Sequence, residues 1–142
     1  MTTKLITKTK KDHDKWATPP KVYEALDNEF GFDMDPCPID WAPETHANGL
    51  AIPWGTSTFV NPPYSKVSDW YKKAHEEWSL GGKRVVMLVN ATTDTIAFHK
   101  YVVGSAEVRF VKGRIRFIDP ERPGHKLDSN PKPSLIIIFH PK

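Results

Sequence analysis

The stretch Asn61-Pro62-Pro63-Tyr64 combines residue types that suit the binding of a flat base with an exocyclic amine. Its two prolines remove two backbone N–H groups and restrict φ, so it forms a rigid turn rather than ordinary helix or central strand. The Asn61 amide oxygen and the Pro62 carbonyl can each accept one N–H of the amine. The Tyr64 ring can stack on the base. The stretch therefore indicates a site for a planar amine.

A turn without chemistry is the alternative explanation of the same residues. The chain contains 13 Pro, and a second pair lies at Pro19-Pro20, so the motif can arise from composition. It would then be a polyproline turn that joins a strand to a helix. The motif alone leaves both explanations open.

Composition limits the class of protein. A chain of 142 residues with 39% hydrophobic residues predicts one packed domain. The net charge of +3 is compatible with nucleic acid but does not establish it. No apolar run has the length of a membrane span, and the single Cys37 excludes an internal disulfide and fits a reducing cytoplasm. The histidines are scattered without zinc-site spacing, so we expect no metal.

The first part of the chain predicts a basic arm and then a helix. Residues 1–14 are rich in lysine; they form either a solvated, frayed terminus or a flexible arm that contacts phosphate. Thr18 is the expected N-cap of the helix and Pro19 its first residue, with an apolar stripe at spacing four and Gly31 as its end. A short strand follows at 32–35 and is broken by Pro36.

The remaining elements alternate between strand and helix before becoming β-rich. We expect a loop at 36–57, a strand at 58–60, a helix at 67–78, a buried strand at 84–89, a helix at 94–103, a hairpin of 107–111 with 114–118, a loop at 119–133 and a last strand at 134–140. Early alternation predicts a parallel α/β sheet, and the late β-rich part predicts an antiparallel strand or hairpin at one edge.

Polar side chains stand at the carboxyl ends of three of the expected strands. They are Asp35, Asn61 and Asn90. In open α/β sheets, ligands bind beyond the carboxyl ends of the strands. The order of elements therefore predicts a single domain over residues 15–142 with its site at this rim, which favours the amine-binding explanation of the turn.

Several ordered motifs together resemble a known family, the phage-type DNA N6-adenine methyltransferases, or Dam-like family. The matching pieces are Trp16-Ala17-Thr18-Pro19, Phe32 to Cys37, Phe59 to Ser65, Leu88 to Thr95, Gly113 to Phe117, and Pro133-Ser134. The resemblance implies transfer of a methyl group from S-adenosylmethionine to the amine of a flipped adenine in double-stranded DNA. It also implies an abbreviated Rossmann-like methyltransferase sheet, mostly parallel with an antiparallel edge strand. The setting would be the cytoplasm of a bacterium or a phage-infected cell, and the protein a monomer or a homodimer.

The resemblance also implies roles for particular residues. The catalytic set is Asn61, Pro62, Pro63 and Tyr64. The set that binds the cofactor is Trp16, Thr18, Pro19, Asp35, Pro36, Cys37 and Asn61. From the residues themselves, Arg114 and Arg116 either contact phosphate or form the solvent-exposed face of the expected hairpin. Arg122 and Lys126 belong to the loop at 119–133, which we expect to contribute to DNA binding. The sequence departs from methyltransferases in general at one place, because Asp35-Pro36-Cys37-Pro38 stands where a glycine-rich cofactor loop is usual.

Alternatives remain for individual residues and for the substrate. Asp35 either accepts from the cofactor's α-ammonium group or caps a turn before Pro36. Pro36-Cys37 resembles the nucleophile of cytosine carbon-5 methyltransferases, although a small buried residue is the simpler explanation. The amine acceptor could be an RNA adenine, a cytosine N4 or a glutamine amide, and a non-catalytic DNA-binding relative is the alternative from another class.

Overall fold

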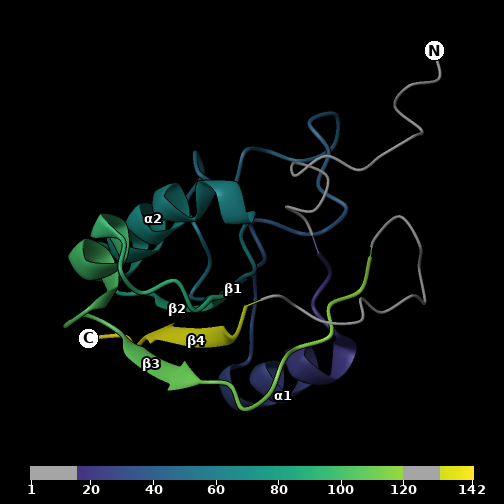
Figure 1. Ribbon diagram of the computed structural model, residues 1–142. Helices are drawn as coiled ribbons and strands as arrows, with labels where there is room; N and C mark the ends of the chain where they lie inside the picture. The colour runs from purple at the N-terminus through teal and green to yellow at the C-terminus, as the bar shows by residue number, and fades with distance from the viewer. Residues whose placement is uncertain (1–15, 120–131) are drawn as a thin grey trace.

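The computed structural model describes residues 16–119 and 132–142, which form a sheet with helices on both faces (Figure 1). In chain order the elements are α1 (Pro20–Phe30), β1 (Ser57–Val60), the 3-10 turn η3 (Tyr64–Lys66), α2 (Val67–Ser79), β2 (Arg84–Asn90), the π-helical turn η4 (Phe98–Val102), β3 (Glu107–Phe110) and β4 (Ser134–Phe139). The predicted basic arm, residues 1–14, lies outside the described residues.

The sheet is mixed, with strand order β1-β2-β4-β3. β1 and β2 are parallel, whereas β4 is antiparallel to both of its neighbours. A single parallel bridge from Met34 to Thr58 extends the sheet beyond β1, where a short strand was predicted. The carboxyl ends of β1 and β2 therefore lie side by side and bring Asn61 near Asn90.

The predicted antiparallel strand lies one strand further into the sheet than expected. The sequence placed an antiparallel strand or hairpin at the edge, but the reversed strand β4 lies between β2 and β3. The prediction of a hairpin between 107–111 and 114–118 is wrong, because β3 pairs with β4 instead. The continuous apolar run of β4 agrees with its inner position, because an inner strand has both of its faces covered.

Residues 114–118 lie against one face of the sheet. Ile115 and Phe117 are buried there together with Phe59 and Val86, and Ile118 forms a single antiparallel bridge with Ala17. Alternating Arg and apolar residues suggested a hairpin strand, but the alternation here separates exposed arginines from side chains packed under the sheet.

Helices cover the two faces of the sheet (Figure 1). α2 and η4 pack on the face where β2 presents Val85, Met87 and Val89. α1 packs on the other face, where Leu26 meets Val86 and Leu88. Alternate residues of β2 thus enter two separate cores, which explains its unbroken apolar sequence.

The predicted helix boundaries are confirmed at the C-terminus of α1 and corrected at its N-terminus. Gly31 ends the helix with φ of 62°, and its N–H donates to the Asp27 carbonyl. Pro19 rather than Thr18 occupies the N-cap position, Pro20 begins the helix, and no side chain caps it. The Thr18 hydroxyl therefore makes its contacts elsewhere.

The loop from 36 to 56 is anchored to α2 through Glu77. The Glu77 carboxylate accepts from the Trp54 N–H and from the ammonium groups of Lys83 and Lys73, over 2.7–2.9 Å. Burial alone would raise the Glu77 pKa, but hydrogen bonds from these three residues lower it to about 2. Gly49 packs tightly against another part of the same loop, because a Cβ there would lie 2.1 Å from the Pro36 carbonyl oxygen.

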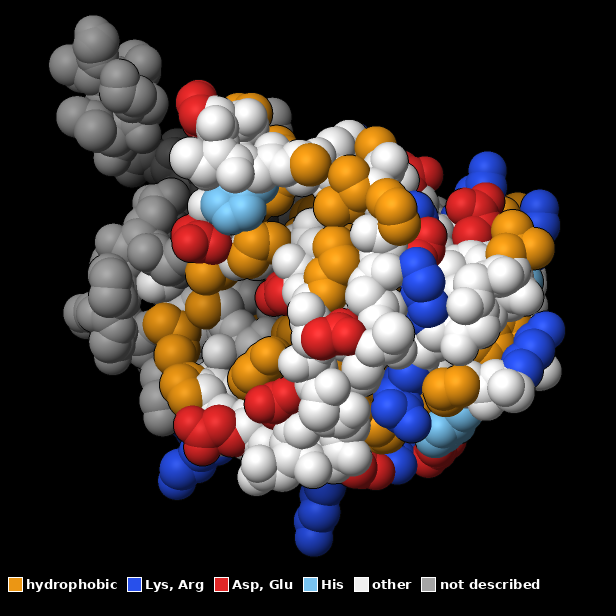
Figure 2. All heavy atoms as spheres, turned by 180° about the vertical axis from the view of Figure 1, so that it is seen from behind, with side chains coloured by type: hydrophobic (Ala, Val, Ile, Leu, Met, Phe, Trp, Pro, Cys, Tyr) orange, Lys and Arg blue, Asp and Glu red, His pale blue; other side chains and the backbone are white. Residues whose placement is uncertain are grey.

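Charged side chains of both signs are interspersed on the surface. Figure 2 shows the molecule from behind the view of Figure 1. Most of its Lys and Arg side chains lie in the right half, with acidic side chains among them. A hollow rimmed by hydrophobic and acidic side chains opens on the left. In the part of the chain that the structure describes, no helix is long and apolar enough to cross a membrane.

Candidate functional site

The Asn61-to-Tyr64 turn leaves the carboxyl end of β1 and leads into η3 and α2. Pro62 is buried, and Pro63 is extended with φ of −62° and ψ of 136° directly before η3. This is the rigid link from strand to helix that two consecutive prolines predict. The turn therefore holds the Asn61 side chain and the Tyr64 ring at fixed places on the rim of the sheet.

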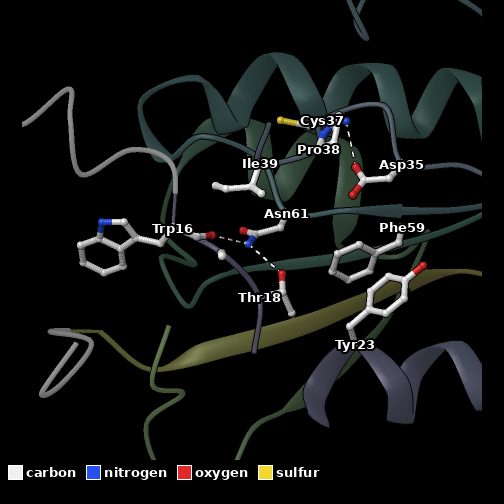
Figure 3. A pocket seen from close by; sticks show the side chains of 10 residues that line it. Trp16, Thr18, Tyr23, Asp35, Cys37, Pro38, Ile39, Phe59 and Asn61 are labelled. Atoms are coloured by element: carbon white, nitrogen blue, oxygen red, sulfur yellow. Dashed lines mark hydrogen bonds between the residues drawn. The ribbon is translucent and has the colours of Figure 1, made fainter. Parts of the chain in front are cut away.

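The Asn61 amide group is oriented by the segment before α1. Its Nδ2 donates to the Trp16 carbonyl and to the Thr18 hydroxyl, each over 2.9 Å (Figure 3). Both amide hydrogens are used in these bonds, so the oxygen is the part of the side chain that can accept from a ligand.

A first cavity, of about 190 Å³, lies beside Asn61 on the α1 side of the sheet (Figure 3). Its walls combine the Asp35 carboxylate with aromatic rings and are formed by Trp16, Ala17, Thr18, Tyr23, Asp35, Cys37, Pro38, Ile39, Phe59 and Asn61. A carboxylate among aromatic rings suits a ligand that carries both a cationic group and a flat apolar part.

The Asp35 carboxylate has an unusual protonation equilibrium. Burial raises its pKa to about 6; the Cys37 N–H, which donates to Asp35 Oδ1 over 2.9 Å, opposes the rise, and the charge of Asp40 adds to it. The residue as a whole is exposed, so water reaches the hollow in which the carboxyl lies. Protein atoms nevertheless surround the carboxyl closely enough to raise its pKa. Asp35 thus caps the turn, as one of the two explanations predicted, and it also faces the cavity, where its role as acceptor for the cofactor stays a prediction.

A second cavity, of about 280 Å³, adjoins the Tyr64 side of the turn. Its walls are Tyr64, Val67, Tyr71, Asn90, Thr92, Thr95 and Lys132. Asn90 Oδ1 is buried and, within residues 16–119 and 132–142, has no hydrogen-bond partner. A buried acceptor without a donor is costly, so a ligand N–H in this cavity would satisfy it.

A third cavity, of about 340 Å³, lies between the loop from 36 to 56 and the start of α2. It is lined by Pro36, Cys37, Trp41, Asn48, Gly49, Leu50, Pro63, Lys66 and Trp70, and it shares Cys37 with the first cavity. Asn61, Tyr64 and Pro63 therefore each line a different cavity. The turn stands at the junction of all three.

The structure brings together most of the residues predicted for the cofactor. Trp16, Thr18, Asp35, Cys37 and Asn61 line the first cavity. Two do not: Pro36 is buried and lines the third cavity, and Pro19 is the N-cap residue of α1. Cys37 is half-buried rather than buried.

The residues predicted to contact DNA are only partly described. Arg114 and Arg116 are exposed on the segment that packs under the sheet. Arg122 and Lys126 lie outside the described residues.

Sequence reasoning missed several residues that line the cavities. Tyr23 and Phe59 were assigned to a helix and a strand without a role, and Tyr71 to the core face of α2. Their apolar periodicity was recognised, but periodicity does not tell a core position from a cavity wall. Thr92 and Thr95, just after β2, lie in the motif Leu88 to Thr95 of the family resemblance but were not among the predicted site residues.

Comparisons with known proteins agree on one family. The sequence matches the family model described as DNA N-6-adenine-methyltransferase (Dam) over residues 6–142. A protein of Haemophilus phage HP1 (strain HP1c1) named DNA N-6-adenine-methyltransferase is 34% identical, over 100% of this chain and 87% of its own length. A protein of Escherichia phage T1 with the same name is 30% identical, over 89% of this chain and 62% of its own length.

Proposed function

Because this chain belongs to the DNA N-6-adenine-methyltransferase (Dam) family, we propose that it transfers a methyl group from S-adenosylmethionine to the N6 amine of an adenine flipped out of double-stranded DNA. The observation that carries the proposal is the orientation of Asn61. Its oxygen is the group left to accept, at the junction of a cavity with a carboxylate and a cavity with a stacking ring.

The first cavity fits the chemistry of the cofactor. Asp35 would accept from the α-ammonium group, and the rings of Trp16, Tyr23 and Phe59 would pack on its less polar parts. Ligand pockets commonly measure about 300–1,000 Å³, and the third cavity, which meets the first at Cys37, offers the additional room. When bound, S-adenosylmethionine supplies an electrophilic methyl group on a sulfonium.

The second cavity fits a flat base. Tyr64 offers a ring for stacking, which is worth about 1–3 kcal/mol per base. The buried Asn90 oxygen offers an acceptor for a base N–H. A base inside a duplex cannot reach such a site, so it has to be extruded from the stack first.

The residues of the turn would prepare the amine for transfer. The adenine amine is a poor nucleophile because its lone pair is delocalised into the ring. If the Asn61 oxygen and the Pro62 carbonyl hold its two hydrogens, the nitrogen becomes more pyramidal and its lone pair is freed for attack. This is orientation together with electrostatic stabilisation, and it needs no strong base.

The sheet supports a finer proposal for the fold, an abbreviated Rossmann-like methyltransferase sheet. Parallel β1 and β2 end side by side at the site, and the reversed β4 provides the antiparallel strand that such a sheet requires. Exposed Arg114 and Arg116 are candidates for phosphate contacts, for which positive charge is the main requirement. Either a monomer or a homodimer is compatible with this proposal.

Modification of DNA in a cell tests the proposed substrate. The chain is expressed in a bacterial host that lacks adenine methylation, and its plasmid is sequenced for modified bases. N6-methyladenine at a recurring sequence is the expected result. Methyl groups on cytosine N4 would reject adenine as the target and support the cytosine alternative, and unmodified DNA from cells with folded protein would reject DNA as the substrate.

A further inference from the structure

We infer that Thr18 is a positioning residue: the Trp16 carbonyl selects which end of the Asn61 amide faces the reacting amine, and the Thr18 hydroxyl holds the amide in that orientation. The inference rests on the proposed function, since it assigns to Thr18 the task of keeping Asn61 ready as an acceptor. Thr18 would act through Asn61 and not on the substrate amine itself.

The chemistry of the two partners determines the orientation of the amide. The Trp16 carbonyl can only accept a hydrogen bond, so the group of Asn61 that faces it must be Nδ2. In the flipped orientation two oxygens would lie against each other at this place. The Thr18 hydroxyl accepts the second hydrogen of the same nitrogen and so holds the amide in the orientation that the Trp16 carbonyl selects.

The segment that carries these partners is itself fixed. The Ala17 N–H donates to the Ile118 carbonyl over 2.9 Å, and the Ile118 N–H donates back over 3.1 Å. The Trp16 ring also packs against Phe117, with ring centroids 6.1 Å apart. The segment therefore cannot simply follow Asn61 if the amide turns, and a flipped amide would lose its bond to the Trp16 carbonyl.

The use of the Thr18 hydroxyl distinguishes this role from an ordinary helix cap. A threonine before Pro19-Pro20 is well placed to cap a helix, yet α1 has no side-chain cap. The hydroxyl lies 2.9 Å from Asn61 instead. Its hydrogen-bonding capacity thus serves the site and not the helix that follows.

Two substitutions of Thr18 test the inference. Thr18→Val keeps the shape but removes the acceptor, and we expect kcat to fall about 10–100-fold, which is in the range for a partly buried donor left without its partner. Thr18→Ser restores a hydroxyl, and we expect kcat within about threefold of wild type. The matched control is Thr45→Val, because Thr45 is exposed in the loop from 36 to 56 and lines none of the three cavities.

Nuclear magnetic resonance supplies a measurement that does not depend on activity. The side-chain NH₂ signals of Asn61, identified by their loss in Asn61→Asp, should exchange slowly in wild type and in Thr18→Ser. In Thr18→Val at least one of the two protons should exchange faster.

Each outcome separates the positioning role from the methyltransferase proposal. Unchanged exchange together with unchanged kcat in Thr18→Val would overturn the role of Thr18, and so would a loss of activity that Thr18→Ser does not restore. If wild type proved inactive on DNA, the proposed function would fail, while the exchange experiment would still report on the orientation of Asn61. Should Thr18→Val not fold, Thr18→Ala and Thr18→Ser provide the same comparison.

Discussion

Trp16 and Tyr64 pack edge to face, with ring centroids 5.6 Å apart and ring planes at 82°. Trp16 lines the first cavity and Tyr64 the second, so this pair forms part of the boundary between the proposed sites for cofactor and base. A base that stacks on Tyr64 would press on Trp16, which lines the cavity proposed for the cofactor. The two sites are therefore in physical contact through one aromatic pair.

Tyr64 is expected to contribute its ring to base binding. Tyr64→Ala should raise KM for DNA about 5–150-fold, which corresponds to the loss of about 1–3 kcal/mol of stacking. Tyr64→Phe keeps the ring and should stay much closer to wild type. Methylation kinetics give KM, and the fluorescence of 2-aminopurine placed at the target base reports its extrusion. Equal KM values for the alanine and phenylalanine variants would contradict stacking on this ring.

Asp35 is expected to make cofactor binding depend on pH. Because the pKa of its carboxyl is raised to about 6 in the protein without ligand, protons compete with the cofactor's ammonium group below that pH. Affinity should fall about tenfold for each further pH unit. Asp35→Asn should weaken binding about 10–100-fold at pH 7.5, as for loss of a charged hydrogen bond, and abolish this pH dependence. Isothermal titration calorimetry measures both effects.

Asp40 provides the control for that experiment. Its charge contributes to the raised pKa of Asp35, so Asp40→Asn should keep the binding of cofactor and move the midpoint of the pH profile to lower pH. If Asp35→Asn binds cofactor as tightly as wild type, the carboxylate does not hold the ammonium group.

The same carboxylate is expected to reduce the stability of the protein without ligand. Its pKa is raised from 3.8 to about 6 on folding. Below pH 3.8 the carboxyl is protonated in both the folded and the unfolded state, and the stability of the fold is highest with respect to this group. As the pH rises towards 6 the unfolded state ionises first, so the free energy of unfolding falls. Asp35→Asn should consequently gain in Tm relative to wild type across this interval and keep the gain at neutral pH. Thermal unfolding at several pH values, without cofactor, measures the difference.

Cys37 is expected to be dispensable for chemistry. It lines the first and third cavities, but the proposed transfer forms no covalent bond to the protein. Cys37→Ser should therefore keep kcat within about threefold, since a thiol nucleophile would lose far more on replacement by a hydroxyl. Loss of methylation in a folded Cys37→Ser protein would instead support covalent attack on the base ring.

The sequence predicted the regular elements well where local signals were strong. The stripe of Val22, Leu26 and Phe30 with Gly31 predicted α1, and the unbroken run of β2 predicted a strand buried on both faces. These signals depend on neighbouring residues in the chain, so they can be read without knowledge of the tertiary structure.

Strand partners could not be predicted in the same way. The pattern of 114–118 was compatible with a hairpin, but the choice between that segment and β4 as partner of β3 depends on which strand fills the sheet between β2 and β3. That choice is made by packing between parts of the chain far apart in sequence. Thr18 shows the same limit, because its partner Asn61 is distant in the chain.

For the site, one motif and the position at strand ends were the informative signals. Asn61 was found from the Asn61-to-Tyr64 motif, Asp35 ends a predicted strand, and both line the first cavity. Tyr23 and Tyr71 were missed because each shares its helix with core residues. Only the packing of separate elements leaves these two rings beside a cavity.

Methyl transfer to DNA by wild type and Asn61→Ala tests the central claim most directly. Each protein is incubated with unmethylated double-stranded DNA and S-adenosylmethionine labelled in its methyl group, and the DNA is digested to nucleosides. The account predicts label in N6-methyldeoxyadenosine for wild type and a rate at least about 100-fold lower for Asn61→Ala, with cofactor binding retained and Asn28→Ala on the exposed face of α1 unaffected. Label in a cytosine product, or wild-type turnover by Asn61→Ala, would contradict it.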